Sequence, residues 1–331
     1  MYFKKYNSIT NSYDEEFMNK LKYLVYEGPW YISEKIHGAN CQIAVTDEGI
    51  EIGGRNEITN DILWKEVLLQ YENKARALFN STNAKRIILF GEFFGGAYPH
   101  PGVPKDKNAR KIQKGVWYSP HNHVIFFDLY IEPEHEPPYY ANIKSLRYLL
   151  NFFNIPVINF KRFNTLAEAL QYPNDEESTI YERYDLPKIE NNIREGIVIR
   201  PEKDLWIGQS RVIIKNKNDR FKEVWKERRP IVDQKELNEK QINAMEDMLR
   251  YVTENRVINI LSHYGTESNL NLLGRLIQDT NKEVQEEFER HNNIFNSMEK
   301  AEIKEITRRI NKEVSKLCKK VIMNQMENEQ C

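Results

Sequence analysis

The sequence predicts an α+β domain over residues 1–230, built from antiparallel sheets flanked by helices, followed by a small all-α domain over residues 231–331. The chain has 331 residues, more than a single hydrophobic core usually organises. Up to Pro230, short β-type runs alternate irregularly with helical segments, a pattern typical of an α+β fold rather than a βαβ repeat. Beyond Pro230, glycine becomes rare and apolar residues recur at helical spacing.

The first domain is expected to contain a hairpin, several longer strands and two helical regions. The turn Asp47-Glu48-Gly49 separates two apolar runs, which predicts a hairpin that returns Arg55 towards Lys35. The strands are predicted at residues 41–46, 50–52, 86–94, 123–130, 196–200 and 211–215. The helices are predicted at residues 60–79, from the spacing of Leu63, Val67 and Tyr71, and from Thr165, which forms a capping box with Glu168, to Pro173.

The second domain is expected to consist of four helices. The first is marked by apolar residues at helical spacing, and the other three follow from similar patterns. These helices carry Ile242, Met245, Leu249 and Val252, and then span residues 255–264, 280–295 and 300–323.

Composition excludes several classes of protein. The net charge of -1 and the pI of about 6.7 mean that any nucleic-acid surface is a local patch, such as the basic run 215–229, although such a run is often only a solvated face. The three cysteines match no metal-binding spacing. Without a secretory signal or a long apolar run, the chain is expected to be intracellular and cytoplasmic. Nucleotide-binding loops of the G-x-x-x-x-G-K-[ST] and G-x-G-x-x-G types are absent from the sequence.

The segment Glu34-Lys35-Ile36-His37-Gly38-Ala39-Asn40 contains a candidate nucleophile, Lys35. A lysine attacks as the neutral amine, and nearby cations favour that form by repulsion. If residues 211–217 form a strand, the period of two places Lys215 and Lys217 on one face, where they could repel the charge on Lys35 and bind a nucleotide phosphate. The alternative is an exposed edge strand that carries lysines against aggregation.

Two carboxylates stand where apolar β-type runs meet glycine, Glu92 in Leu89-Phe90-Gly91-Glu92 and Glu195 before Gly196. Carboxylate oxygens suit Mg²⁺, which keeps several waters and bridges to substrate phosphate. Each glutamate could instead pair with Arg194, Arg200 or Lys35. His37 could contact phosphate or metal, or complete a hydrogen-bond network.

Phe127 lies in the apolar run Val124-Ile125-Phe126-Phe127-Asp128-Leu129, whose simple alternation places it on one face with Ile125 and Leu129. A phenylalanine in such a run is usually a core residue. A flat ring at this position can also stack on a purine.

These motifs, in this order, resemble the RNA ligase 2 family of the covalent nucleotidyltransferase superfamily. The superfamily motif K-x-D-G appears here as Lys35-Ile36-His37-Gly38, with the histidine of the RNA ligase 2 branch and Asn40 following as it does there. The helical tail also agrees, because related DNA ligases and capping enzymes usually continue into an OB-fold.

The resemblance implies a role for each candidate residue. Lys35 would be linked to AMP, with His37 and Glu195 acting beside it and Glu195 and Glu92 serving the metal, Glu92 through water. Lys215 and Lys217 would hold the α-phosphate, and the remaining nucleotide contacts would come from Glu34, Ile36, Asn40, Arg55, Glu92 and Phe127. In the tail, Arg256, Asp279 and Glu283 look similar to residues used when the adenylate passes to RNA, although ordinary salt bridging between helices explains them equally well.

The sequence therefore predicts an ATP-dependent RNA ligase that uses Mg²⁺ or Mn²⁺, acts on RNA nicks or ends and works as a monomer with no evident protein partner. Its reaction would run through lysyl-AMP and RNA-adenylate, and the family likeness favours nicks in duplex RNA. The alternatives are a DNA ligase or an mRNA-capping guanylyltransferase of the same superfamily. A catalytically silent RNA-binding module is the alternative from a different class.

Overall fold

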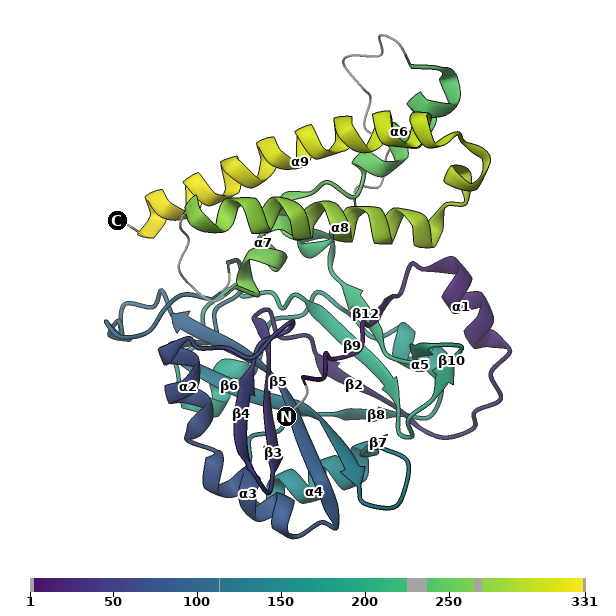
Figure 1. The fold of residues 1–331 in the computed structure, drawn as a ribbon. Coiled ribbons are helices and arrows are strands. Elements are labelled where there is room, and N and C mark those ends of the chain that lie inside the picture. The colour runs from purple at the N-terminus through teal and green to yellow at the C-terminus, as the bar shows by residue number, and fades with distance from the viewer. Residues whose placement is uncertain (1–2, 113, 225–236, 265–269, 330–331) are drawn as a thin grey trace. The chain divides into compact units, whose positions relative to one another are not determined.

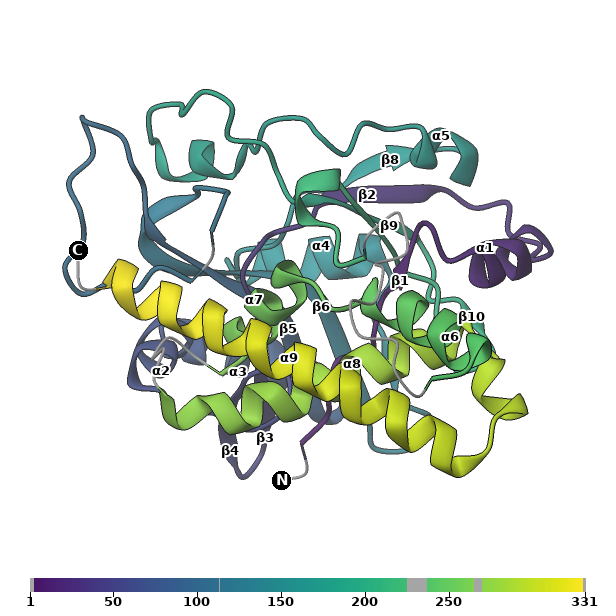
Figure 2. The ribbon, with the colours of Figure 1, turned by 90° about the horizontal axis from the view of Figure 1, so that it is seen from above.

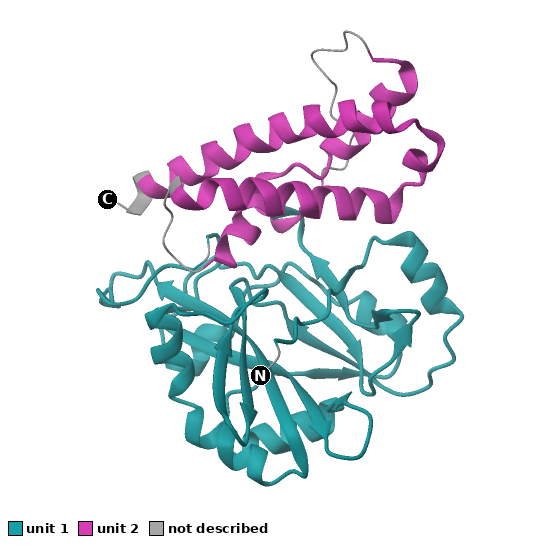
Figure 3. Ribbon diagram, in the orientation of Figure 1, with its two compact units in different colours: residues 1–220 teal, residues 221–331 magenta. Residues whose placement is uncertain are grey.

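The computed structural model describes residues 3–112, 114–224, 237–264 and 270–329. The chain divides into two compact units, residues 1–220 and 221–331, and each is described by itself (Figure 3). The domain boundary expected at residue 230, and the end of the basic run from residue 225 onward, lie outside the described residues. The predicted α+β class, with a helical C-terminal part, is confirmed (Figure 1).

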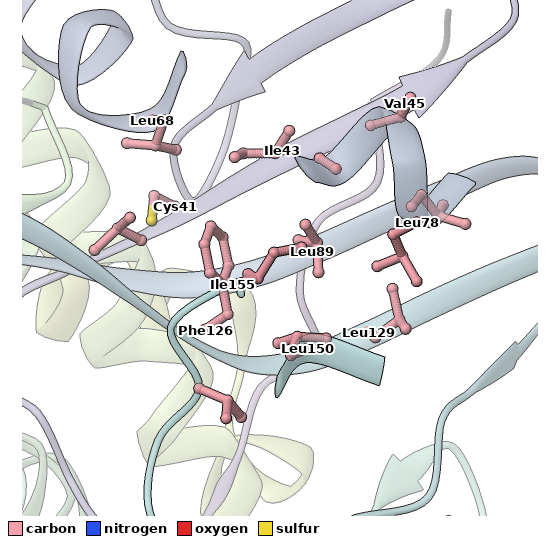
Figure 4. Close-up of a cluster of buried hydrophobic side chains, with 14 of the residues drawn as sticks. Cys41, Ile43, Val45, Leu68, Leu78, Leu89, Phe126, Leu129, Leu150 and Ile155 are labelled. Atoms are coloured by element: carbon pink, nitrogen blue, oxygen red, sulfur yellow. The ribbon is translucent and has the colours of Figure 1, made fainter. Parts of the chain in front are cut away.

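The first sheet of unit 1 has five antiparallel strands in the order β4-β3-β5-β6-β7. Helices α2, α3 and α4 contribute to the apolar core on one of its faces, and Figure 4 shows the side chains that meet there. The strands are β3 (Ala39–Thr46), β4 (Gly49–Gly53), β5 (Ala84–Ala97), β6 (Ser119–Pro133) and β7 (Tyr139–Tyr140), and the helices are α2 (Ile62–Leu69), α3 (Glu72–Asn80) and α4 (Ile143–Phe152). The single helix expected over 60–79 is therefore two helices, separated at Gln70 and Tyr71.

The second sheet of unit 1 has the order β1-β12-β9-β2-β8. All neighbours are antiparallel except β1 and β12, which run parallel. Helices α1 and α5 carry residues of the core on its outer face. The bounds are β1 (Thr10–Asn11), β2 (Trp30–Glu34), β8 (Lys161–Phe163), β9 (Gly196–Pro201), β12 (Ile214–Lys217), α1 (Glu15–Lys22) and α5 (Leu166–Leu170). The remaining short elements of this unit are β10 (Trp206–Ile207), β11 (Ser210–Arg211), η1 (Ile180–Tyr184) and η2 (Asp219–Phe221).

The strand expected over 211–215 is interrupted. β11 ends at Arg211 and β12 begins at Ile214, because Ile213 donates its N–H to the Arg211 carbonyl at 2.9 Å and forms a tight turn. Lys215 and Lys217 still lie in one strand, β12, so their side chains are still expected on one face of it.

The prediction that Ile125, Phe127 and Leu129 share a face is wrong. The register between β5 and β6 shifts at Phe127, because Gly91 pairs with Phe126 while Phe90 pairs with Asp128. This bulge inserts one residue and reverses the alternation. Leu129 therefore lies in the helix-covered core with Phe126, whereas Phe127 packs in a separate cluster with residues of both sheets.

A buried charged cluster joins the two sheets. Asp128 of β6 pairs with Arg211, and its Oδ2 lies 3.4 Å from Nη1 of Arg200 in β9. The Tyr6 hydroxyl donates to the same carboxylate at 2.8 Å. The two arginines hold the pKa of Asp128 below its usual range, although burial alone would raise it. The cluster links β6 to β9 of the other sheet next to Phe127, whose carbonyl accepts a hydrogen bond from Nη1 of Arg200 at 3.1 Å.

Unit 2 is helical and has its own apolar core, formed by residues of all four of its α-helices. Its elements are α6 (Glu239–Leu249), α7 (Glu254–Ser262), η3 (Leu270–Leu272), α8 (Leu273–His291), η4 (Ile294–Ser297) and α9 (Lys300–Glu329). The helix expected over 280–295 begins seven residues earlier, because Thr280 is a buried residue inside α8 and does not cap it. No helix within the described ranges is long and apolar enough to cross a membrane.

Candidate active site

The candidate nucleophile follows the end of β2, beside the start of β9. Lys35 donates its backbone N–H to the Gly196 carbonyl at 3.0 Å, directly after the pairing of Glu34 with Ile197. A Cβ on Gly196 would lie 2.2 Å from the Asn216 carbonyl oxygen, and its φ of +155° is unfavourable for other residues. Glycine therefore allows the start of β9 to lie against β12, which brings Glu195 close to the lysines of that strand.

Glu195 is the centre of the site. Its Oε2 lies 2.7 Å from Nζ of Lys35 and 3.3 Å from Nδ1 of His37, and its Oε1 lies 2.9 Å from Nζ of Lys217. The side chain of Glu195 is only 1% exposed and that of Lys217 6%, whereas Lys35 is 17% exposed. One buried carboxylate thus bridges the candidate nucleophile, Lys35, and the candidate phosphate-binding residue, Lys217.

The positive charges around Glu195 keep its carboxylate ionised. Burial alone would raise the pKa of Glu195, but Lys217, Lys35 and His37 together hold that pKa well below its usual range. Of the pairings that the sequence left open for Glu195, the structure shows the pair with Lys35. Arg194 pairs instead with Glu176 at 2.8 Å.

Lys215 and Lys217 lie on one face of β12, as the period of two predicts. They pair with Val198 and Gly196 of β9, while Asn216 pairs with Ile197 and its amide oxygen accepts from Ser12 and Asn174. The alternative of an exposed edge strand is wrong, since β12 lies between β1 and β9.

Glu92 faces the same site from the first sheet. It pairs across the strands with Asn40 and accepts a hydrogen bond from the backbone of Gly38. Burial raises the pKa of Glu92 to about 7; Lys35 opposes the rise, and Glu195 adds to it. Arg55, two residues beyond β4, is half-buried and also lowers the pKa of Glu92, so the predicted hairpin does bring it to the site.

Two buried oxygen atoms beside the nucleophile are suited to accept hydrogen bonds from a ligand. Oδ1 of Asn40 and Oε1 of Glu34 are buried and have no hydrogen-bond partner among the described residues. Burial raises the pKa of Glu34 to about 7, although its other oxygen accepts from the Thr179 N–H at 3.4 Å. Ile36, between Glu34 and His37, is buried. Buried polar groups are normally paired, so these two oxygens mark a place for donors that the chain does not supply.

Phe127 lies on the side of β6 that faces the second sheet. Its ring is partly buried and meets that of Tyr6 edge-on, with 5.3 Å between centroids. The ring therefore remains a candidate for both roles expected from the sequence, a core residue and a platform for a purine, because it packs on a neighbour and stays partly accessible.

Tyr118 is a site residue that the sequence reasoning missed. Its buried hydroxyl accepts the backbone N–H of His37 at 2.9 Å and so holds the loop that carries Lys35. Burial, with Glu34 nearby, raises the pKa of Tyr118 well above its usual value. Its position before a strand gives no signal in the sequence, because the contact spans 81 residues.

The three candidates of the helical unit lie on α7 and α8. Arg256 is buried, donates from Nε to the Tyr251 carbonyl at 3.0 Å, and lies 3.6 Å from Glu283. Asp279, one turn before Glu283, accepts from the Tyr264 hydroxyl at 2.6 Å. The alternative of salt bridging between helices is thus observed for Arg256 and Glu283.

Lys35, Glu92 and Glu195 thus gather where the two sheets of unit 1 face each other. Comparison with known proteins shows the family to which the chain belongs. A model of the RNA ligase family matches residues 28–217, and one of the T4 RNA ligase 2 C-terminal domain matches residues 233–316. The chain belongs to the RNA ligase family and, within it, to the RNA ligase 2 branch.

The individual relatives share only a small fraction of identical residues with this chain. The mitochondrial RNA-editing ligase 2 of Trypanosoma brucei brucei is 24% identical over 328 residues, which cover 80% of this chain and 77% of that protein. Among solved structures, a Naegleria gruberi RNA ligase variant with ATP and Mn has 14% identity and a TM-score of 0.44, and another with AMP and Mn has 14% and 0.45. Both alignments cover 66% of this chain and 57% of the other.

Proposed function

We propose that this protein is an ATP-dependent RNA ligase that forms a covalent adenylate on Lys35 and seals nicks in duplex RNA. The observation that carries the proposal is the pairing of Lys35 and Lys217 with one buried carboxylate, Glu195. In a member of the RNA ligase family, this arrangement supports the roles that we assign to Lys35 as the nucleophile and to Lys217 as a phosphate-binding cation.

In the first step, the partly exposed Lys35 ammonium group loses a proton to solvent and its neutral amine attacks the α-phosphorus of ATP. The N–P bond forms as the bond to pyrophosphate breaks, and a second proton of the amine leaves with the pyrophosphate. Lys217, and Lys215 on the same face of β12, stabilise the negative charge that builds on the α-phosphate. Because its pKa is held low, Glu195 is a weak proton acceptor, so it orients Lys35 and does not serve as a strong base. His37 contacts the same carboxylate and helps to fix it.

The nucleoside part of ATP is held by the surrounding residues. We assign the ribose to Arg55 and Glu92, and adenine to the ring of Phe127. Glu34, Ile36 and Asn40 complete the nucleotide contacts, and the unpartnered oxygens of Glu34 and Asn40 are suited to accept hydrogen bonds from nucleotide donors.

The carboxylates also fit a divalent cation. Glu92 and Glu195 affect each other's charge, and two carboxylates are the number that Mg²⁺ usually takes from a protein when substrate phosphate supplies further oxygens. The described residues contain no group of three or more metal-binding side chains, so such an ion depends on the nucleotide. Glu92 and Glu195 would hold Mg²⁺ or Mn²⁺, and the ion would offset the charge of the phosphates.

In the later steps, AMP passes from Lys35 to an RNA 5′-phosphate and a 3′-hydroxyl displaces it. We assign these steps to the helical unit, through Arg256, Asp279 and Glu283. Arg256→Ala should form the enzyme adenylate normally and lose sealing, with Glu283→Gln showing a milder loss. Loss of adenylation in Arg256→Ala would contradict this division of labour.

The decisive experiment is the intact mass of the protein after incubation with ATP and Mg²⁺. The mass should increase by one adenylate, and Lys35→Ala should show no increase. GTP in place of ATP tests a guanylyltransferase, and nicked DNA in place of nicked RNA tests a DNA ligase. A wild-type protein that gains no nucleotide would refute the proposal and favour a silent RNA-binding module.

A further inference from the structure

The loop of residues 98–118 between β5 and β6 carries an unusual concentration of positive charge. It contains Lys105, Lys107, Arg110, Lys111 and Lys114, and its one acidic residue is Asp106. The whole chain has a net charge of -1, so this loop is a strongly cationic region on a nearly neutral protein. Its lysines lie outside the site described above.

Part of the loop's charge is already compensated. Nη2 of Arg110 lies 2.9 Å from Asp61, and His121 contacts Asp106 at 2.7 Å. The four lysines differ, since none of them forms an ion pair with a carboxylate in the described part of the chain. Lys105, Lys107 and Lys111 are exposed, Lys114 is half-buried, and Lys111 lies over the ring of Trp117 at 4.6 Å.

The backbone of the loop is anchored to β5 and β6 at Arg110 and Ile112. The amide of Asn122 exchanges two hydrogen bonds with the backbone of Arg110, at 2.9 and 2.8 Å. Ile112 donates to the Gly95 carbonyl at 3.1 Å. An ordered base presents the lysines at a defined place, which lowers the entropy lost when a ligand binds.

The base of the loop is part of the wall of the active site. The side chain of Asn192, three residues before Glu195, exchanges hydrogen bonds of 2.8 and 2.7 Å with the backbone of Trp117. Tyr118, which follows Trp117 in the chain, accepts the backbone N–H of His37 with its hydroxyl. In Figures 1 and 2 the loop projects between the end of β5 and the start of β6, on the side of unit 1 away from α1. A polyanion whose end lies at Lys35 and that runs along this side of unit 1 would therefore pass these lysines.

We propose that residues 98–118 bind the phosphate backbone of the RNA strand next to the break, through Lys105, Lys107, Lys111 and Lys114. This inference rests on the proposed RNA-ligase function. Lysines act as point charges towards phosphate and read no sequence, which suits an enzyme that must seal breaks of any sequence. ATP does not require these contacts, because the nucleotide is bound by other residues.

The test measures binding of a nicked RNA duplex without ATP, by fluorescence anisotropy over a series of KCl concentrations. The variants are Lys105→Gln with Lys107→Gln, and Lys111→Gln with Lys114→Gln. Each lost phosphate contact should lower the slope of log affinity against log salt by about 0.7–0.9, so each double variant should lose about 1.4–1.8. Adenylation of Lys35 in the absence of RNA should keep its wild-type rate.

The matched control removes two lysines from α1. Lys20→Gln with Lys22→Gln changes the net charge equally at exposed positions on the other side of the unit, and should keep the wild-type slope. A wild-type slope in both loop variants, or an equal loss in the control, would overturn the proposal. Because binding is measured without ATP, that result can coexist with normal adenylation and sealing, whereas failure of the proposed function appears as no adenylate in the wild type.

Discussion

Replacing Glu195 by glutamine tests the structure of the active site most directly. The variant keeps the shape of the side chain but removes the negative charge between Lys35 and Lys217, whose amines lie 2.7 and 2.9 Å from it. Lys217 would then be a buried ammonium without its main counter-charge. Removing one partner of a buried ion pair costs about 3–5 kcal/mol. For a unit of this size, that corresponds to a melting temperature lower by roughly 6–20 °C.

The loss of stability in Glu195→Gln should also depend on pH, and the lowered pKa of Glu195 determines whether this loss grows or shrinks as the pH falls. A carboxyl group whose folded pKa is depressed contributes stability above its unfolded pKa of about 4.3, and loses it as the pH falls towards the folded pKa. The gap between wild type and Glu195→Gln should therefore be full at pH 7 and narrow progressively below about pH 4.3.

The assay is thermal unfolding of the full chain, followed by circular dichroism at several pH values. Glu176→Gln is the matched control, because this half-exposed carboxylate pairs with Arg194 at 2.8 Å and should contribute no more than about 1 kcal/mol. If Glu195→Gln melts no earlier than Glu176→Gln at pH 7, Glu195 is not the buried counter-charge described above. A gap that stays constant down to pH 3 would also contradict the reasoning.

Three further outcomes follow from the structure. Phe127→Leu should raise KM for ATP in the adenylation assay by about 5- to 150-fold, the equivalent of one stacking contact of about 1–3 kcal/mol; an unchanged KM would make the ring a core residue only. Burial raises the pKa of Glu92 to about 7, so its stability contribution is complete below about pH 4.3 and lost as the pH rises through about 7. Glu92→Gln should remove that part of the pH dependence of melting, and a profile that still matches the wild type would refute the assignment. Asp128→Asn removes the buried carboxylate that Arg200 and Arg211 share, while Arg211 keeps its contact with Asp204. The variant should lower the free energy of unfolding by about 3–5 kcal/mol in denaturant titrations, whereas the exposed Asp47→Asn should change it by less than about 0.5 kcal/mol.

The parts of the site that could be predicted from the sequence depend on local geometry. The common face of Lys215 and Lys217 follows from the two-residue period of a strand, and it holds because β12 is regular between Ile214 and Lys217. The return of Arg55 follows from a hairpin turn. In both cases a few neighbouring residues determine the outcome.

The parts that could not be predicted depend on pairings between distant segments. The bulge at Phe127 exists because the pairing of β5 with β6 shifts by one residue, and the apolar run itself contains no sign of it. The bridging role of Glu195 requires β9 to lie between β2 and β12, a strand order that local patterns do not fix. The basic loop is different, since its lysines are visible in the sequence and only their lack of acidic partners needed the structure.

The charges around Lys35 suggest how the site balances stability with affinity for an anion. Glu195 is ionised, whereas Glu34 and Glu92, with pKa values raised to about 7, are partly neutral at physiological pH. The resting site thus keeps one full negative charge, enough to stabilise the buried Lys217, while the neutral fraction of the other two carboxyls leaves the lysines attractive to a triphosphate. If all three glutamates were fully ionised, they would repel the nucleotide. Burial therefore acts selectively, because the carboxyl group that lies against two lysines stays charged, whereas the two that are less compensated by cations are only partly ionised.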